Sequence, residues 1–313
     1  MPKKIAVVCG PTACGKTALA VELALALDGE VVSADSMQVY RELDIGTAKP
    51  TEGEKKGVPH HMLDVAGPSE DYSVARYVAE AAPVVDDILS RGKLPIVAGG
   101  TGLYIDALIA GREFAPFRPD TGLRQELEDR GSNQGLEALY KELERVDPET
   151  AGRIHPNDQK RIIRALEVFY TTGSTISRHN EETKRLPPRY EAVRLGLRFA
   201  DRADMRGRID ARVDEMFSRG LAEEVRSLMA VLPPGCTAMQ AIGYKELSAA
   251  LREGRSLEEA RDEIKLRTRQ YAKRQLTWFR RETSIGWYEW GETPKISDAL
   301  LFSTEFLRAH GIG

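Results

Sequence analysis

The chain has 313 residues, 42% of them hydrophobic, which is enough for one large domain or two modest ones with a sizeable core. Its net charge of −3 supplies no overall positive field, so a nucleic-acid partner must be met by local basic patches. Three scattered cysteines are too few for a disulfide framework or a zinc site and suit a reducing cytoplasm, where we expect the protein. No apolar run approaches the ~20 residues that span a bilayer, and the N-terminus lacks a signal-peptide pattern, so we expect no membrane association.

A glycine-bounded loop near the N-terminus lies between two apolar segments. Residues 5–9 are typical of a short buried strand, and residues 17–27, rich in Ala, Leu and Val, of a buried helix. The loop has the G-x-x-x-x-G-K-[ST] pattern, in which backbone N–H groups, the helix N-terminus and Lys16 favour an anion, and the Thr17 hydroxyl can ligate Mg²⁺. A glycine-rich turn that matches by chance is the weaker alternative. We expect a di- or triphosphate to bind at Gly10, Pro11, Thr12, Ala13, Cys14, Gly15, Lys16 and Thr17.

The strand predicted over residues 30–35 ends in Asp35. Ligands bind at the carboxyl edge of a parallel sheet, so Asp35 lies near the phosphate loop if the first two strands are close in the sheet. It is then a general base or a carboxylate linked to Mg²⁺, and the alternative is a helix cap or turn residue. The strand and glycine turn predicted at 94–102 carry no acidic residue, which argues against ATP hydrolysis. The adjacent His60 and His61 are expected to be structural.

The middle of the chain is expected to form a separate helical block. A helix over residues 72–91, interrupted or restarted at Pro83, is followed by a linker at 113–120 and a charged helical stretch at 121–182. A second linker, residues 185–189, ends the block. Turns within it are expected at Gly131, Gly135 and Pro148.

An alternating strand pattern at 193–199 returns the chain to the sheet. We therefore predict an α/β fold, a P-loop NTPase-like parallel sheet flanked by helices, with an inserted small all-helical subdomain. The core is assigned residues 1–118 and 194–313, and the insertion residues 119–193.

One helix is expected over residues 201–228, with Arg208 and Arg212 four residues apart on one face. Two arginines placed in this way could clamp a pyrophosphate. The alternative is a solvated face on which they pair with acidic residues of the same helix, Asp204, Asp210 and Asp214.

A basic stretch over residues 264–281 contains seven cations and no acidic residue. Aromatic residues are interleaved, and Arg267, Tyr271, Arg274 and Trp278 share one helical stripe. Cations neutralise phosphates and aromatic rings stack on unpaired bases, which favours nucleic-acid contact over a buried aromatic face with a basic rim. Residues 286–290 are expected to form a closing strand.

An ordered set of motifs runs through the chain. It comprises the phosphate loop and residues 35–40, 44–50, 60–64, 99–104, 164–167, 242–246 and 268–275. In this set the chain resembles the tRNA dimethylallyltransferases (tRNA isopentenyltransferases) nearly end to end. Cys14 departs from the family's usual Ser. Its backbone N–H is unchanged, so phosphate binding should survive, but a free thiol there is expected to make the site sensitive to oxidation.

The resemblance implies transfer of a dimethylallyl group from dimethylallyl diphosphate to the exocyclic N6 amine of the adenosine 3′-adjacent to the tRNA anticodon. The phosphate loop then binds the prenyl diphosphate rather than ATP, with Mg²⁺ on Thr17, Arg208 in the clamp and Asp35 as the base. The base is flipped out of the anticodon loop to reach this site. The residues implied to contact tRNA are Asp35, Ser36, Met37, Gln38, Thr101, Arg124, Gln159, Lys160, Arg161, Ile162, Ile163, Tyr271, Arg274 and Trp278. Nothing in the sequence demands more than a monomer.

Two other functions use the same phosphate loop. A small-molecule kinase of the same core fold needs the loop but not the acid-free basic stretch. An RNA-binding NTPase switch predicts tight nucleotide binding without covalent change in RNA.

Overall fold

The computed structural model describes residues 3–111, 121–233, 235–291 and 294–313. Contacts divide the chain into two compact units, residues 1–111 with 189–313, and residues 112–188. The expected boundaries lay at 118/119 and 193/194. Residues 189–193 fall in the first unit because its fifth strand begins at Glu191. The linker expected at 113–120 lies outside the described residues.

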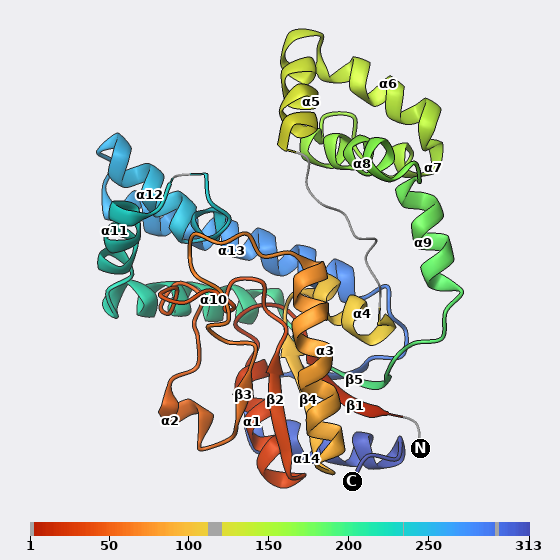
Figure 1. Cartoon of the computed structure of the whole chain (residues 1–313). Helices are drawn as coiled ribbons and strands as arrows, with labels where there is room; N and C mark the ends of the chain where they lie inside the picture. Colours follow the sequence, from red (N-terminus) through yellow and green to blue (C-terminus); the bar gives the residue numbers. More distant parts are fainter. Residues whose placement is uncertain (1–2, 112–120, 234, 292–293) are drawn as a thin grey trace. The chain divides into compact units, whose positions relative to one another are not determined.

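The first unit is built on a parallel sheet of six strands (Figure 1). The strand order is β3-β2-β4-β1-β5-β6, so β4 separates the first two strands of the chain. Their carboxyl ends still meet at one edge, because all strands run the same way. The strand bounds are β1 Lys4–Cys9, β2 Gly29–Ser33, β3 His60–His61, β4 Leu94–Gly99, β5 Glu191–Phe199 and β6 Gly286–Trp290.

Helices cover both faces of the sheet, as the buried strands β1 (from Ile5 onward) and β2 require. In Figure 1, α3 (Val74–Ser90) lies in front of the strands, and α1 (Lys16–Ala26) and α14 (Ile296–Ala309) lie behind them. α1 and α14 pack on each other, and residues of both enter one hydrophobic core with β1 and β5. Short α2 (Glu52–Lys55) and α4 (Gly102–Ala110) complete this part of the fold.

The helix α3 continues through Pro83, so the expected interruption is wrong. Pro83 lies on the exposed side of the helix, where water can satisfy the carbonyl group that the missing N–H leaves free. The buried side of α3, which includes Tyr77 and Val85, keeps its packing.

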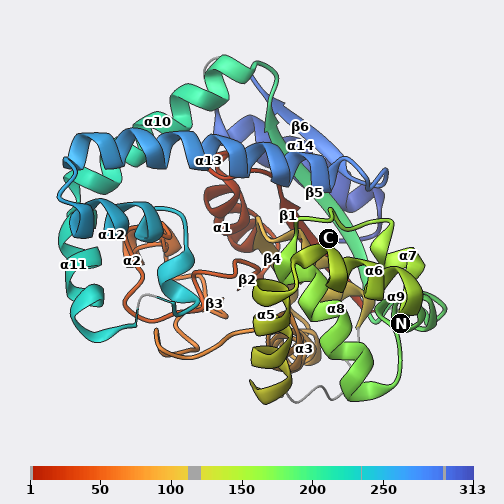
Figure 2. The same ribbon diagram turned by 90° about the horizontal axis from the view of Figure 1, so that it is seen from above.

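The helix expected over residues 201–228 is two helices, α10 (Arg202–Ser218) and α11 (Leu221–Val231). Gly220 separates them with φ 98°, a left-handed conformation that glycine adopts readily. A 3-10 turn at Ala238–Gln240 and α12 (Tyr244–Glu253) lead into α13 (Leu257–Phe279). Figure 2 shows α13 running alongside α10, with which it is in contact.

The second unit contains α5 (Thr121–Asn133), α6 (Leu136–Val146), α7 (Pro148–Ala151), α8 (Gln159–Thr172) and α9 (Ile176–Lys184). Its core joins leucines of α5 and α6 to the buried side of α8. The turn expected at Gly131 is wrong, because α5 runs through it. Gly131 instead makes room for Leu139, whose Cδ1 lies 3.2 Å from where a Cβ would be. The turn is at Gly135, with φ 86°.

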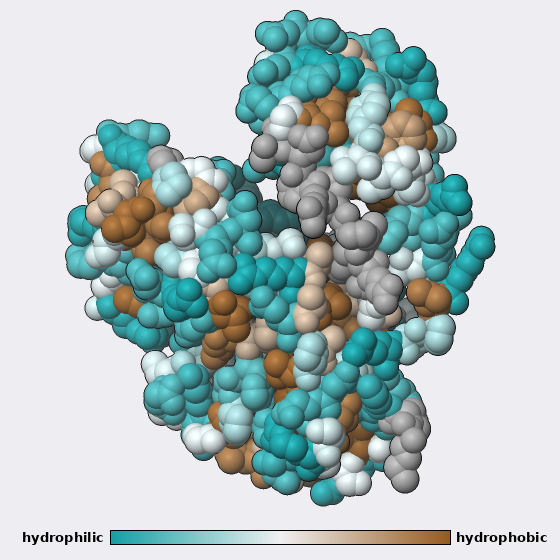
Figure 3. Space-filling model, in the orientation of Figure 1, coloured by the Kyte–Doolittle hydropathy of each residue, from teal (hydrophilic) through white to brown (hydrophobic). Residues whose placement is uncertain are grey.

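In the described ranges, no helix is both long and apolar enough to cross a membrane. The face drawn in Figure 3 is mainly hydrophilic, and its hydrophobic patches are small and separate.

Candidate active site

The phosphate loop joins the end of β1 to the start of α1. Three of its residues have positive φ, namely Gly10 at 140°, Ala13 at 62° and Gly15 at 83°. A Cβ on Gly10 would lie 2.3 Å from the carbonyl oxygen of Leu197, so the loop can pass β5 only with glycine there. No side chain caps α1 at Gly15, so its first N–H groups remain available to an anion.

Cys14 is a buried part of the loop, with 2% of its surface exposed. Burial raises the pKa of its thiol, and the nearby charge of Lys16 opposes this only in part. The indole N–H of Trp290 donates to the Cys14 carbonyl oxygen over 2.9 Å. Oxidation proceeds through an accessible thiolate, so this environment argues against the oxidation sensitivity expected from the sequence.

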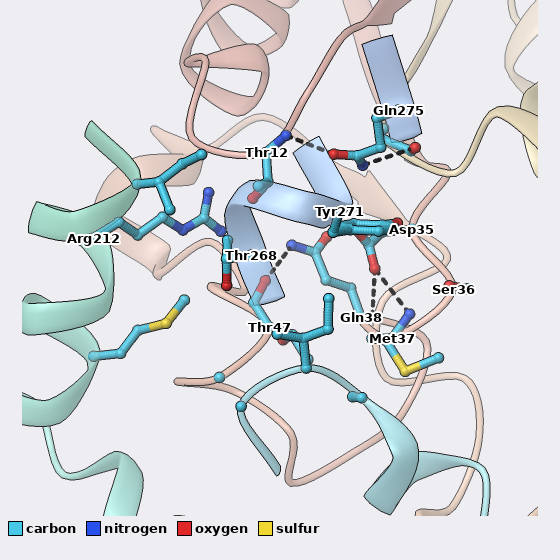
Figure 4. A pocket seen from close by; sticks show the side chains of 18 of the residues that line it. Thr12, Asp35, Ser36, Met37, Gln38, Thr47, Arg212, Thr268, Tyr271 and Gln275 are labelled. Carbon is cyan, nitrogen blue, oxygen red and sulfur yellow. Dashed lines mark hydrogen bonds between the residues drawn. The ribbon is translucent and has the colours of Figure 1, made fainter. Parts of the chain in front are cut away.

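A cavity of about 340 Å³ opens at the carboxyl edge of the sheet (Figure 4). Thr12, Lys16 and Thr17 of the phosphate loop line it together with residues 35–38 after β2. Its remaining walls include the glycine turn after β4, several polar residues of α10 and α13, and a set of apolar side chains, among them Ile209, Val213, Met216, Ile242 and Ile264. The cavity therefore has one end suited to an anion and one wall suited to a hydrocarbon.

Asp35 both fixes a turn and lines the cavity. Its Oδ1 accepts hydrogen bonds from the N–H groups of Met37, at 2.8 Å, and Gln38, at 3.3 Å, which fixes the turn after β2. Its Oδ2 accepts no hydrogen bond from the described residues, and Asp35 lines the cavity. One oxygen thus orients the carboxylate while the other can accept a proton.

Gln38 is fixed by its own amide. Its Oε1 accepts from Ser33 Oγ at 3.0 Å, and its Nε2 donates to the carbonyl oxygens of Thr47 and Ala48, both at 3.2 Å. Both amide hydrogens are therefore committed to the protein, and bidentate contact with an adenine edge would break these bonds.

The loop that holds Gln38 is anchored by Glu224 on α11. The Glu224 carboxylate accepts from three consecutive N–H groups, those of Asp44 (3.1 Å), Ile45 (2.8 Å) and Gly46 (3.1 Å). It also accepts from the Tyr244 hydroxyl at 2.5 Å. A Cβ on Gly46 would lie 2.4 Å from the Tyr244 ring, so ring and loop are in direct contact. Sequence reasoning gave no role to Glu224 or Tyr244.

Two contacts join other loops at the cavity. Thr101 Oγ1 accepts from the N–H of Ser36 at 3.1 Å. Gln275, on α13, accepts from the N–H of Thr12 at 2.8 Å and donates to the carbonyl oxygen of Gly100 at 2.9 Å. Gln275 belongs to a motif that carried the resemblance, but no role followed from the sequence.

Arg208 and Arg212 both lie beside the phosphate loop. With Ala13, Gly15, Lys16 and Thr17 they line a second cavity of about 310 Å³. Arg208 is exposed, whereas Arg212 is partly buried and lines both cavities. Burial lowers the pKa of the Arg212 guanidinium, and the charge of Asp35 opposes this shift. The sequence pattern named both arginines and the family resemblance chose Arg208, but Arg212 is the one that lines both cavities.

Two acidic residues of α10, Asp210 and Asp214, pair with α13 rather than with Arg208 and Arg212. Lys265 Nζ lies 2.6 Å from Asp214, and Arg269 forms a two-bond pair with Asp210. The cations of the amino-terminal half of α13 are therefore used within the fold. Further along, Lys273, Arg274, Arg280 and Arg281 have no acidic partner among the described residues.

The aromatic residues of the stripe differ in their environment. Burial raises the pKa of Tyr271 to about 12, with Asp35 acting in the same direction, so its hydroxyl remains protonated in the cavity wall. Trp278 donates its indole N–H to Asp106 at 2.9 Å and is 38% exposed, outside the cavity. Phe279 is buried.

In the second unit, the six residues implied to hold tRNA do not all face solvent. Ile162 and Ile163 are buried in the unit's own core, so their side chains cannot hold RNA, and this part of the prediction is wrong. The apolar spacing of α8 could have indicated this, since both isoleucines share a face with Leu166. Gln159, Lys160 and Arg161 are exposed at the start of α8, and Arg124 pairs with Glu128 at 3.1 Å.

A parallel sheet with a phosphate loop at its carboxyl edge places the protein in the P-loop NTPase-like class of folds. The family model described as IPP transferase matches residues 38–282, and one described as isopentenyl transferase matches residues 3–69. The chain therefore belongs to the IPP transferase family.

Relatives with assigned activities are similar along most of their length. The tRNA dimethylallyltransferase of Acetivibrio thermocellus is 48% identical over 284 residues, 90% of each chain, and that of Geobacter sulfurreducens is 49% identical over 288 residues, 92% of each. The full-length tRNA isopentenylpyrophosphate transferase of Bacillus halodurans has a TM-score of 0.72 at 42% identity, covering 98% of this chain and 97% of that one. A eukaryotic dimethylallyltransferase acting on tRNA has a TM-score of 0.81 at 31% identity, covering 99% and 80%. These similarities favour prenyl transfer over the kinase alternative.

Proposed function

We propose that this protein transfers a dimethylallyl group from dimethylallyl diphosphate to the N6 amine of the adenosine 3′-adjacent to the anticodon in tRNA. The carbon–oxygen bond to the diphosphate breaks, a carbon–nitrogen bond forms, and the amine loses a proton. The observation that carries the proposal is the single cavity in which the phosphate loop, Asp35 and an apolar wall meet. The named activities of the relatives support the choice of substrates.

The donor fits the two ends of the cavity. Its diphosphate would bind the N–H groups at the start of α1, with Lys16, Arg208 and Arg212 beside it. Its five-carbon chain would lie against the apolar side chains of α10 and α13. Charge that develops on the leaving diphosphate is then stabilised by groups already in place, which lowers the barrier to departure.

We assign Asp35 as the base for the acceptor. An adenine amine is a weak nucleophile because its lone pair is delocalised, so removal of its proton as the new bond forms assists the reaction. Oδ1 holds the carboxylate in place through the turn, and Oδ2 would take the proton. The adenine would be flipped out of the anticodon loop and enter past Ser36, Met37 and Gln38.

Mg²⁺ is the proposed cofactor. Thr17 is exposed and lines both cavities, so its hydroxyl would be the protein ligand, with diphosphate oxygens and water completing the coordination. Within the described ranges, no three His, Cys, Asp or Glu side chains gather into a metal site. Bound at Thr17, the ion would supply positive charge to the leaving group.

Contact with tRNA is proposed for the carboxyl end of α13 and the two residues that follow it. Lys273, Arg274, Arg280 and Arg281 would neutralise phosphates, and Trp278 offers an exposed ring for stacking. In the second unit, Arg124 and the exposed start of α8 would contact the anticodon stem-loop.

Mass spectrometry of tRNA nucleosides tests the proposal. Unmodified tRNA is incubated with the protein, Mg²⁺ and dimethylallyl diphosphate, then digested. We expect one adenosine per substrate tRNA to gain a five-carbon unit, and none to gain it without donor. Unchanged tRNA together with ATP consumption on a metabolite would support the kinase instead. Tight nucleotide binding with unchanged RNA would support an NTPase switch.

A further inference from the structure

A buried glutamine connects α13 to the phosphate loop. Gln275 is 5% exposed, and its side-chain amide spans two loops that come from different strands. Its Oε1 accepts from the N–H of Thr12 at 2.8 Å, and its Nε2 donates to the carbonyl oxygen of Gly100 at 2.9 Å. Figure 4 shows both bonds at the edge of the cavity.

The hydrogen bond between Thr12 and Gln275 uses one N–H of the phosphate loop within the protein. That N–H points at Gln275 and is not available to an anion. The N–H groups that remain for a diphosphate follow it, beginning at Ala13, whose positive φ of 62° turns the loop. Such a backbone conformation persists in a non-glycine residue only where neighbouring contacts hold it.

Close packing against the backbone at Gly100 also restricts the orientation of the Gln275 amide. A Cβ on Gly100 would lie 2.2 Å from its Nε2, and a Cβ on Gly102 would lie 2.2 Å from Cδ1 of Trp278. The turn after β4 therefore presents bare backbone to two residues of α13 that are three positions apart. This close seat leaves the amide little freedom to rotate.

We propose that Gln275 is a positioning residue for the donor diphosphate. It acts through Thr12, holding the phosphate loop in the conformation in which the N–H groups from Ala13 onward converge. The proposal rests on the proposed function in one respect, namely that the diphosphate of the donor binds this loop. It adds that α13, which carries the residues proposed for tRNA, also sets the geometry of the donor site.

Two substitutions disrupt the hydrogen bonds of Gln275, one on α13 and one on the turn after β4. Gln275→Met keeps the length of the side chain but loses both hydrogen bonds. Gly100→Ala leaves Gln275 intact and inserts a methyl group where its Nε2 lies. The matched controls are Gln270→Met, on the exposed side of α13, and Gly207→Ala, where a Cβ meets nothing within 4 Å.

Calorimetric titration of the full chain with dimethylallyl diphosphate and Mg²⁺, and separately with the tRNA anticodon stem-loop, measures the outcome. We expect Gln275→Met and Gly100→Ala each to lower donor affinity about tenfold, because each leaves a buried N–H unpaired. Stem-loop affinity should stay within about twofold, and both controls should match the wild type. In the double variant the losses should not multiply, because both substitutions remove the same contact.

Three results would overturn the inference. Gln275→Met could bind donor like the wild type, donor and stem-loop affinities could fall together, or the two losses could multiply. Unfolding temperature identifies a variant that has not folded, in which case the other variant decides. Failure of the proposed function is distinct, since the wild type itself would then not bind dimethylallyl diphosphate.

Discussion

The Oδ1 oxygen of Asp35 accepts a hydrogen bond from the backbone N–H of Met37 over 2.8 Å, whereas Oδ2 accepts none from the residues that the structure describes. This arrangement separates the structural and chemical roles of the carboxylate. Asp35→Asn keeps an oxygen for the turn but has almost no basicity. We expect transfer to fall about 10²- to 10⁴-fold while stem-loop affinity is unchanged. Single-turnover transfer and a binding titration check this, and transfer at the wild-type rate would exclude Asp35 as the base.

Glu224 should stabilise the loop that holds Gln38. Its carboxylate accepts four hydrogen bonds, most of them partly buried, so Glu224→Ala leaves their donors unpaired and should cost about 2 kcal/mol in the free energy of unfolding. The same variant should lower kcat/KM for tRNA, because the loop carbonyls that fix Gln38 move. Urea denaturation and steady-state kinetics are the measurements. Glu223→Ala, which removes only an exposed ion pair with Arg226, is the control and should be near neutral.

The two ends of the basic stretch over residues 264–281 should respond differently to loss of charge. Arg281→Ala removes a cation with no acidic partner among the described residues, and should weaken stem-loop binding and lower the slope of log K against log salt by about 1. Lys265→Ala removes a cation paired with Asp214 and should leave that slope unchanged. Equal effects of the two substitutions would contradict the proposed tRNA-binding segment.

Glu30 should make stability depend on acid pH. Its side chain, on β2, is buried, and hydrogen bonds from Arg91 and then His61 outweigh burial and lower the pKa of its carboxylate to about 2. A carboxyl group with a lowered pKa in the folded state stabilises the fold above its unfolded pKa of about 4.5, and the effect is lost as pH falls towards 2. Glu30→Gln should therefore be less stable than the wild type at pH 7, with the difference shrinking below pH 4. A pH-independent difference would be inconsistent with this ion pair.

The three cysteines should differ in reactivity. Cys9 and Cys14 are buried, and burial raises the pKa of Cys9 to about 12 and raises that of Cys14 as well. Cys236 is partly exposed. Titration of the folded protein with a thiol reagent should modify one cysteine per chain quickly, and the other two only on unfolding. Fast modification at Cys14 would restore the expectation of an oxidation-sensitive loop.

The sequence predicted the elements that have strong local signals. The strand–loop–helix at residues 5–27, the strands ending near Asp35 and Gly99, and the basic helix all follow from apolar periodicity and glycine positions. The helix α14 was not predicted, because its role as a cover for α1 depends on contacts across almost the whole chain. The break at Gly220 was also missed, since an isolated glycine within a helical pattern does not by itself require a left-handed turn.

In the site, the sequence identified residues whose side-chain type indicates their proposed chemistry, such as Lys16 and Asp35. It did not identify Glu224 or Gln275, because their importance comes from which loops they join rather than from a motif. The free and paired cations of α13 also look alike in sequence. Lys265 differs from Arg281 because α10 places Asp214 beside it, and the two form an ion pair.

The strand order has a consequence for how the protein is made. β1 pairs on one side with β4 and on the other with β5, which begins at Glu191, beyond the whole second unit. While a ribosome makes the chain, one edge of β1 therefore stays open until almost two-thirds of the residues have been joined. The second unit has its own hydrophobic core and can fold in that interval. The first unit cannot be completed until β5, β6 and α14 have been synthesised. Its phosphate loop therefore gains its last contacts late, although its residues are synthesised first.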